Sequence, residues 1–335
     1  MLHFILRRLV LIVPVLFGLT ALVFAIARLL PGDPVALAAG PNATPAEIAA
    51  YGKEFGLDRP LIVQYGAYLS GLMKGDFGVS IYTRRPVIED LRAYLPATLE
   101  LVFAAMFLAI AIGIPAGLAA AAWRDKWPDY LSRVVALGSI SMPRFFLGLL
   151  LQLLFAMWLG WLPLGGRFPI TEDPPALVTG FLTLDALIAR DFTAFSIACQ
   201  HLVMPAIAMS LSPLATIMRM MRASTLEVMQ QDYVLTERAL GLSSRLIMLK
   251  YVSRNAISAT LTVIGLYFGW LLGGTVLVET IFDWPGLGLY ATKAVVTQDF
   301  MPVIGVTLVI GTLFVFANFA VDLLYGVINP KVRTE

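Results

Sequence analysis

The chain has 335 residues, of which 59% are hydrophobic and only 14% are charged. Soluble domains carry about 25% charged residues, so this composition excludes a water-exposed globule and indicates an integral membrane protein. The formal net charge of +2 gives no indication of nucleic-acid binding. The single cysteine, Cys199, excludes an intrachain disulfide framework, and two distant histidines are too few for a metal site of cysteine and histidine ligands.

Six apolar segments are long enough to cross a bilayer, which requires about 20 residues in a helix. None shows the alternation of a barrel strand, and backbone groups in lipid must be paired within their own segment. The sequence therefore predicts an all-α membrane protein with transmembrane helices over residues 9–27, 101–123, 134–160, 201–218, 256–278 and 301–321.

The link between the first two spans is predicted to form a small helical cap. Thr44-Pro45-Ala46-Glu47 is a capping box with proline at the first helical position, and Gly56 is suited to end that helix. A second short helix is expected from Pro60 to Met73. At the end of this link, Glu100 is expected at the N-terminus of the second span, where an acid is favourable.

Basic residues in the short connections predict the orientation. They precede the first span (Arg7, Arg8), cluster between the fourth and fifth spans, and follow the sixth (Lys331, Arg333). Because short loops rich in lysine and arginine stay on the cytoplasmic side, we expect both termini and the 223–258 segment to face the cytoplasm. The segments expected to face outward are 31–95, 161–200 and 282–300.

The 223–258 segment is polar, net basic and patterned for helices, although it lies between two apolar spans. Ser224-Thr225-Leu226-Glu227 is a capping box, which predicts a helix that begins there and ends near Leu240. Gly241 can adopt the left-handed conformation that ends a helix, and Ser243 can cap the next one. This pattern favours two helices joined at a sharp corner that could enter a groove on a partner. A solvated loop that merely joins two spans is the alternative.

Arg144 is expected near the middle of the third span, where an arginine costs about 2.5–3.5 kcal/mol on insertion scales. It should therefore face protein or water. One interpretation is contact with a substrate carboxylate, and the other is pairing with a carboxylate of a partner subunit or with a lipid headgroup.

Three more polar residues are expected near the ends of spans. Glu279, at the outer end of the fifth span, could hold the following turn or line an outer gate. Asn318 and Asp322 are one turn apart in the sixth span and are expected to form hydrogen bonds between helices.

Motifs along almost the whole chain resemble the inner-membrane permease subunits of peptide-type ABC importers, a family of dipeptide, oligopeptide and nickel permeases, and above all its dipeptide branch. The motifs are Pro31-Gly32-Asp33-Pro34, Gly56-Leu57-Asp58-Arg59-Pro60, Gly75-Asp76-Phe77-Gly78, Pro96-Ala97-Thr98-Leu99-Glu100-Leu101, Ser141-Met142-Pro143, Asp232-Tyr233, Ala239-Leu240-Gly241-Leu242, Val278-Glu279-Thr280-Ile281-Phe282-Asp283-Trp284-Pro285-Gly286-Leu287-Gly288 and Val321-Asp322-Leu323-Leu324-Tyr325-Gly326-Val327-Ile328-Asn329-Pro330.

This resemblance implies the type I ABC importer permease fold in a bacterial inner membrane. The N-terminal end and first span are expected over residues 1–30, and an extracytoplasmic helical segment over 31–95. The permease domain is expected over 96–328, with a coupling loop at 223–258, and a cytoplasmic tail over 329–335.

The resemblance also implies that the 223–258 segment is the EAA loop, which docks on an ATP-binding subunit. The fixed glycine of that motif matches Gly241, whereas its glutamate and two alanines match Leu235, Thr236 and Glu237, so the motif is degenerate here. The coupling candidates are Asp232, Tyr233, Thr236, Glu237, Arg238, Ala239, Gly241 and Leu242. The candidates for an outer turn are Trp284, Pro285, Gly286 and Gly288.

No Gly-x-x-x-x-Gly-Lys-Ser/Thr pattern occurs, so a phosphate-binding loop is not expected in this chain. The resemblance then implies that ATP and Mg²⁺ bind two partner ATPase subunits. A second permease subunit and an extracytoplasmic solute-binding protein would complete an assembly embedded in the lipid bilayer. Dipeptides are the expected cargo, ahead of oligopeptides, nickel chelates, glutathione and opines.

Two other classes of protein fit less well. A membrane-embedded enzyme needs grouped catalytic residues, and neither Gly-x-Ser-x-Gly nor His-Glu-x-x-His occurs. A passive channel would leave the 223–258 segment without a role. The chain is therefore expected to be a non-catalytic transport subunit with no cofactor or metal of its own.

Overall fold

The computed structural model describes residues 2–29, 44 and 59–328. Across this part of the chain the structure is helical, and its only β-type pairing is an isolated bridge between Val79 and Pro86. The first capping box and Gly56 lie outside the described residues, apart from Thr44. The helices are α1 (Leu2–Leu29), α4 (Leu61–Met73), α5 (Val87–Ala122), α6 (Trp127–Ser141), α7 (Arg144–Leu151), the π-helix η1 (Gln152–Trp158), α8 (Leu182–Ile188), α9 (Phe192–Val228), α10 (Asp232–Ala239), α11 (Ser244–Leu246), the π-helix η2 (Ile247–Val252), α12 (Ser253–Gly273), α13 (Val276–Ile281), α14 (Leu287–Val296) and α15 (Phe300–Ile328).

Five helical runs in this described part are long and apolar enough to cross a membrane. They are α1, α5, α9, the continuous run of α11, η2 and α12, and α15. A sixth candidate is the pair formed by α6 and the run of α7 and η1, which is bent by 104°. The prediction of six spans in an all-α protein is therefore confirmed if this bent pair counts as one span, and the short helix expected before Met73 is confirmed as α4.

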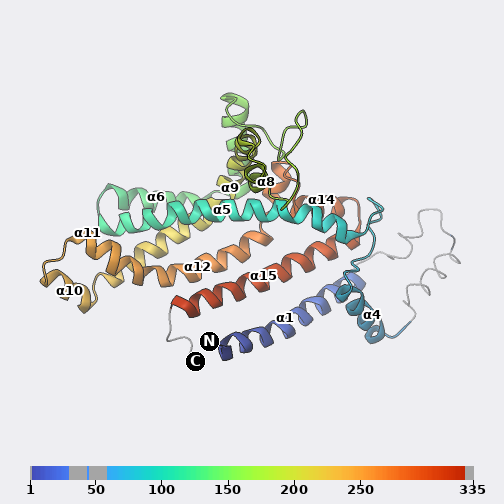
Figure 1. Cartoon of the computed structure of the whole chain (residues 1–335), viewed down its shortest axis with the longest axis horizontal. Helices are drawn as coiled ribbons and strands as arrows, with labels where there is room; N and C mark the ends of the chain where they lie inside the picture. The colour runs from blue at the N-terminus through green and yellow to red at the C-terminus, as the bar shows by residue number, and fades with distance from the viewer. Residues whose placement is uncertain (1, 30–43, 45–58, 329–335) are drawn as a thin grey trace.

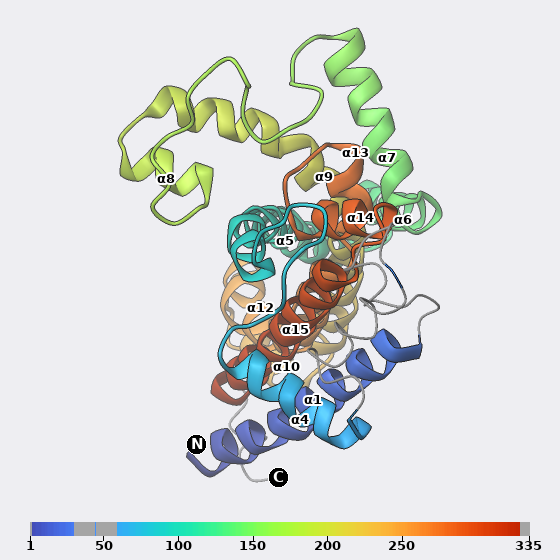
Figure 2. The same ribbon diagram turned by 90° about the vertical axis from the view of Figure 1, so that its right-hand side faces the viewer.

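The long helices lie roughly side by side, with α10 and α11 at one end of the bundle and α14 near the other (Figure 1). The start of α1 and the end of α15 lie close together (Figures 1 and 2). The α7 and α8 helices project from the side of the bundle in both views.

The core of the bundle is the packing of α5 against α9. Gly117 makes this possible, because a Cβ atom there would lie 2.6 Å from the Met218 carbonyl oxygen and 2.7 Å from the Met221 Cβ. Small residues allow such backbone approach between helices in membranes, where van der Waals packing stabilises association. The buried face of α5 continues through Ala97, Leu101, Val102, Ala105 and Ala109.

Glycines also bring α12 against α15. A Cβ atom at Gly265 would lie 2.2 Å from a Val321 methyl carbon, and one at Gly269 would lie 2.7 Å from the Phe314 ring. The outermost helix, α1, packs along the other side of α15 and contributes the ion pair between Arg8 and Asp322, at 2.7 Å. Asp322 thus joins two helices as predicted, whereas the Asn318 amide donates to the Phe314 carbonyl oxygen of its own helix.

The prediction of a helix start at Ser224 is wrong, because α9 runs without interruption to Val228. A capping box needs free N–H groups at its start, and here the preceding turns of α9 already supply carbonyl acceptors. Ser224 and Thr225 are buried inside this helix, and the next helix begins at Asp232 instead.

The third span is broken rather than continuous. Proline disfavours helical geometry at the residue before it and lacks an N–H donor. Accordingly Met142 is extended (φ −101°, ψ 116°), Pro143 precedes the first turn of α7, and the chain turns by 104° between the two halves. Arg144 is therefore the first residue of a helix at a corner, not the middle of a straight span.

Several predicted span boundaries also move, and two of these shifts change the place of a predicted polar residue. The fifth span ends at Gly273, and the separate helix α13 contains Glu279, so the expected end at Val278 is wrong. The helix of the second span, α5, begins at Val87, which places Glu100 well inside this helix rather than at its N-terminus.

Candidate functional site

The backbone at the corner between α10 and α11 has the geometry that ends a helix. Gly241 has φ +78°, which residues with a Cβ atom adopt at a cost, and its N–H donates to the Arg238 carbonyl oxygen at 3.0 Å. Leu242 N–H donates to the Glu237 carbonyl oxygen at 3.3 Å. The Ser243 hydroxyl oxygen then accepts from Leu246 N–H at 3.4 Å and caps α11, as the sequence predicts. We call residues 232–246 the elbow.

The elbow is packed rather than loose. Val234 of α10 is fully buried against Ile247 and Val252 of η2, and Leu242 packs on the same cluster. Tyr233 accepts a hydrogen bond from the Asn255 amide at 2.7 Å, which ties α10 to α12. The elbow is therefore joined to η2 and α12 through side-chain contacts.

The outer surface of the elbow carries the residues predicted for coupling. Glu237 and Leu242 are half-buried, and the remaining candidates are exposed: Asp232, Tyr233, Thr236, Arg238, Ala239 and Gly241. Leu235 and Leu240 stand among them and are 53% and 72% exposed. Exposed leucines beside charges suit a groove with an apolar floor and a polar rim. Sequence reasoning did not single out Leu240, because one leucine in an apolar chain gives no signal.

An ion pair that the sequence analysis did not predict joins α9 to α6. Arg222 donates from Nε and Nη2 to the two Asp129 carboxylate oxygens, at 2.6 Å and 2.9 Å. Arg133 donates to the same carboxylate at 2.7 Å. Asp129 is fully buried in the first turn of α6, where a carboxylate is favourable.

At the other end of the bundle, Glu279 anchors a turn. Its side chain is fully buried and accepts hydrogen bonds from the Thr98 hydroxyl at 2.8 Å and from Leu289 N–H at 3.0 Å. Cβ atoms at Gly286 and Gly288 would lie 2.5 Å and 2.9 Å from this carboxylate, so both glycines leave room for it. Of its two predicted roles, the structure favours holding the turn, because a fully buried carboxylate presents nothing to a path.

Trp284 fixes the same turn to α5. It is 1% exposed, and its indole N–H donates to the Ala97 carbonyl oxygen at 2.8 Å. Pro285 follows it, and Leu287 N–H donates to the Thr98 hydroxyl oxygen at 2.7 Å. Thr98 therefore connects Glu279 to the start of α14.

Glu100, displaced from its expected place, forms a buried pair with Arg167. The Arg167 guanidinium also donates to the Gly180 carbonyl oxygen at 2.6 Å, and Thr183 donates to Glu100 from its N–H at 2.8 Å. These contacts hold the segment between η1 and α8 against α5. Sequence reasoning missed them because the partners are 67 and 83 residues apart.

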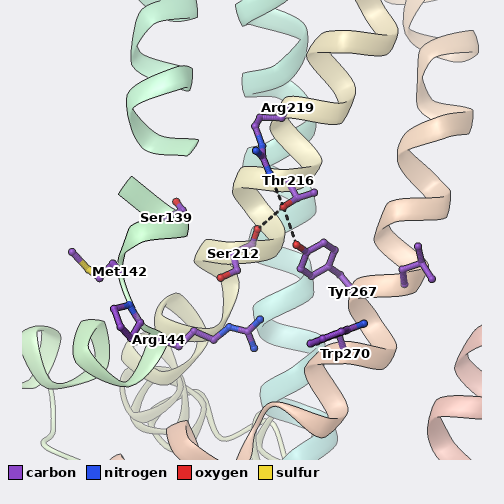
Figure 3. Close-up of a pocket in the computed structure, with 10 residues that line it drawn as sticks. Ser139, Met142, Arg144, Ser212, Thr216, Arg219, Tyr267 and Trp270 are labelled. Atoms are coloured by element: carbon purple, nitrogen blue, oxygen red, sulfur yellow. Dashed lines mark hydrogen bonds between the residues drawn. The ribbon is translucent and has the colours of Figure 1, made fainter. Parts of the chain in front are cut away.

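Arg144 lies apart from the other predicted polar residues, at the corner between α6 and α7. Figure 3 shows its side chain extending between α9 and α12, toward Tyr267 and Trp270. It borders a cavity of about 530 Å³ that also includes Ser212, Thr216 and Arg219. Asn318 and Asp322 do not reach this cavity.

The described residues contain no group of three or more metal-ligating side chains. The described residues do bring together an exposed elbow, the Asp129 contacts between α6 and α9, and a polar cavity beside Arg144 at the corner between α6 and α7.

The comparisons with known proteins agree with this architecture. Residues 113–334 match the family described as binding-protein-dependent transport system inner membrane component, and residues 1–102 match the N-terminal part of such components. A dipeptide transport system permease protein of Alkalihalophilus pseudofirmus is 42% identical, with 99% of this chain and 100% of the relative covered. A probable D,D-dipeptide transport system permease protein of Escherichia coli is 44% identical, covering 96% and 94%. A glutathione transport system permease protein of Escherichia coli is 37% identical, covering 99% of each chain.

Three findings agree. A family model matches most of the chain, relatives above 40% identity cover nearly its whole length, and the structure is a helical bundle with a packed elbow. The chain belongs to the binding-protein-dependent transport system inner membrane components, the permease subunits of peptide-type ABC importers.

Proposed function

We propose that this chain forms one half of the translocation path of an ATP-driven importer for dipeptides or related small peptides. The observation that carries the proposal is the similarity to dipeptide permeases, which extends over 96% or more of the chain at 42–44% identity. The glutathione permease is less similar, at 37%, so dipeptides are preferred over glutathione. Nothing observed favours oligopeptides, nickel chelates or opines.

In this proposal the elbow faces the cytoplasm of a bacterial cell and docks on one of two ATP-binding subunits. Both termini lie on the same side, and the segments 31–95, 161–200 and 282–300 face outward toward a solute-binding protein. The basic residues around the elbow support this orientation. The permease domain spans 96–328, the N-terminal end and first span cover 1–30, and 329–335 form a short cytoplasmic tail.

ATP and Mg²⁺ bind the partner subunits, because this chain has no phosphate-binding loop. Closure of those subunits pulls the elbow and tilts α9 and α12, which opens the path outward, and hydrolysis resets it. Moving a gate from 1:99 to 99:1 requires about 5.5 kcal/mol of differential binding. A packed elbow can transmit such a load to the spans, whereas a loose linker would absorb it.

The coupling contacts in this proposal come from Asp232, Tyr233, Thr236, Glu237, Arg238, Ala239, Gly241 and Leu242, together with Leu235 and Leu240. Exposure of most of these residues supports the assignment. The turn of Trp284, Pro285, Gly286 and Gly288, held by Glu279, keeps the opposite end of the bundle rigid while the elbow end moves.

The test is uptake by the complete complex reconstituted in proteoliposomes with a radiolabelled dipeptide. Accumulation should require the solute-binding protein outside, and ATP together with both ATP-binding subunits inside. Equilibration without ATP would instead indicate a channel, and release of hydrolysed cargo would indicate an enzyme.

A further inference from the structure

Arg144 occupies a position that its local structure does not favour. It is the first residue of α7, and the N-terminal end of a helix carries partial positive charge. Within the described residues it has no carboxylate within salt-bridge distance, in contrast to the paired arginines 8, 85, 124, 133, 167 and 222. The charge is therefore placed in the membrane region without a carboxylate partner among residues 2–29, 44 and 59–328.

The nearest compensating group is the last turn of α12. A Cβ atom at Gly274 would lie 2.8 Å from the Arg144 Nη1 and 3.1 Å from the Trp270 carbonyl oxygen, so the guanidinium approaches the C-terminal end of that helix. A helix C-terminus carries only about half an elementary negative charge. This contact orients the guanidinium and leaves donors free.

The cavity beside Arg144 has the size and polarity of a ligand site. Its volume of about 530 Å³ falls within the roughly 300–1,000 Å³ of small-molecule pockets. Arg219 and the hydroxyls of Ser212, Thr216 and Tyr267 share its lining, and no acidic residue does. A second cavity of about 820 Å³ also reaches Arg144, again with no acid in its lining.

The Thr216 and Tyr267 hydroxyls of the cavity are already committed, whereas the Arg144 guanidinium makes no hydrogen bond to the described residues. Thr216 donates to the Ser212 carbonyl oxygen at 3.1 Å, so Tyr267 donates its proton to the Thr216 oxygen at 2.9 Å. Arg219 reaches the same oxygen at 3.4 Å (Figure 3). An anion in the cavity would therefore be held by the planar Arg144 guanidinium, which matches a carboxylate with two parallel hydrogen bonds.

We propose that the corner cavity is a transit site for the C-terminal carboxylate of the peptide cargo and that Arg144 binds this group as it crosses the membrane. This proposal rests on the proposed function of peptide import. It explains an unpaired arginine at the break of the third span, because an anion crossing the bilayer needs a counter-charge along its way.

The first test compares uptake of radiolabelled alanyl-alanine by proteoliposomes that contain the complete complex with wild-type chain, Arg144→Gln or Arg144→Lys. Arg92→Gln, which changes an exposed arginine of α5, is the matched control. We expect Arg144→Gln to lower the maximal uptake rate about tenfold, because a hydrogen-bonded charge pair is lost, with KM, ATPase activity and the Arg92→Gln control little changed. Arg144→Lys should retain part of the rate. Uptake of Arg144→Gln at the wild-type rate would overturn the proposal.

The second test separates carboxylate binding from a purely structural role of Arg144. Phenylglyoxal modifies accessible arginines, and mass spectrometry reports its addition at Arg144 and Arg92 in the purified complex. Alanyl-alanine should slow the modification of Arg144 but not of Arg92, whereas alanyl-alanine amide should leave both unchanged. Equal effects of the two peptides, or an Arg144 that never reacts because a second permease subunit pairs with it, would contradict the proposal. Failure of the wild-type complex to accumulate peptide with ATP would refute the importer function itself.

Discussion

Arg222, near the end of α9, holds the buried Asp129 carboxylate of α6 with two hydrogen bonds of 2.6 Å and 2.9 Å. The pair lies between the elbow and the corner at Pro143, so it is placed to pass a movement of α9 to α6. Bidentate geometry resists rotation of one helix against the other. The contact therefore makes α6 and the cytoplasmic half of α9 one mechanical unit in the proposed orientation.

Breaking this pair should destabilise the chain. Asp129→Ala leaves Arg222 and Arg133 without their shared carboxylate. Both guanidiniums reach solvent, so we expect a cost of about 1–3 kcal/mol, the range for lost hydrogen bonds to a charged group. We expect a lower temperature of thermal unfolding in detergent and weaker coupling of ATP hydrolysis to uptake. The matched control is Asp125→Asn, which removes a 61% exposed carboxylate in the same loop, keeps a side chain that tolerates the left-handed backbone at φ +59°, and should change little. Equal unfolding temperatures for the two variants would contradict the role of Asp129.

Gly241→Val should separate ATP hydrolysis from transport. A left-handed backbone costs a residue with a Cβ atom about 1–2 kcal/mol, and a β-branched side chain raises that cost, so the corner should reshape. We expect the ratio of peptide uptake to ATP hydrolysis to fall while the amount of inserted protein stays the same. Gly241→Asn should be milder, because asparagine tolerates this conformation. Gly66→Val, in open space on α4, serves as the control. Unchanged coupling in Gly241→Val would argue against the elbow as the transmission element.

Gly117→Ala tests the packing of α5 on α9. The added methyl group would lie 2.6 Å from the Met218 carbonyl oxygen, so the helices must separate, and overpacking of this kind costs about 1–3 kcal/mol. We expect a lower unfolding temperature in detergent. Gly138→Ala adds the same methyl group to α6 with nothing within 4 Å, and there alanine should be neutral or slightly stabilising. A similar effect of both variants would mean that the close approach is not required.

Thr98→Val should loosen the turn at the opposite end of the bundle. The change keeps the side-chain shape but removes the hydroxyl that donates to Glu279 and accepts from Leu287 N–H. Leaving buried polar groups unpaired costs about 1–3 kcal/mol each, so we expect faster hydrogen exchange in α13 and α14. Thr307→Val removes a hydroxyl that bonds only within α15 and is the control. Unaltered exchange in Thr98→Val would show that Trp284 alone secures the turn.

The sequence predicted the parts of the fold that depend on interactions between residues close together in the chain. The apolar segments, the helix ending at Met73, the left-handed Gly241 and the Ser243 cap all follow from residues a few positions apart. The sequence does not distinguish Pro143, where the helix breaks, from the other prolines of the spans. Five of those lie inside continuous helices: Pro14, Pro96, Pro115, Pro205 and Pro213. Neighbouring side chains in the bundle can satisfy the backbone groups that a proline frees, so tertiary packing decides which proline breaks its helix.

The polar contacts of the candidate site were harder to predict because they are distant in sequence. Asp129 and Arg222 are 93 residues apart, and Thr98 and Glu279 are 181 apart. The charges themselves are visible in the sequence, but an apolar chain offers no pattern that assigns one to another. The capping box at Ser224 is a local pattern that misled. Its residues fit the motif, but α9 continues through them to Val228 because the preceding turn supplies the carbonyl acceptors.

The arrangement of α1 has a consequence for how this helix lies in a membrane. Only 6% of the residues in its apolar window are buried, and it packs chiefly against α15, with a further contact to α4 between Thr20 and Tyr65. Lipid would therefore contact most of the surface of α1. The thickness of the bilayer would then act on this helix more directly than on α5 and α9, which pack against each other in the core of the bundle.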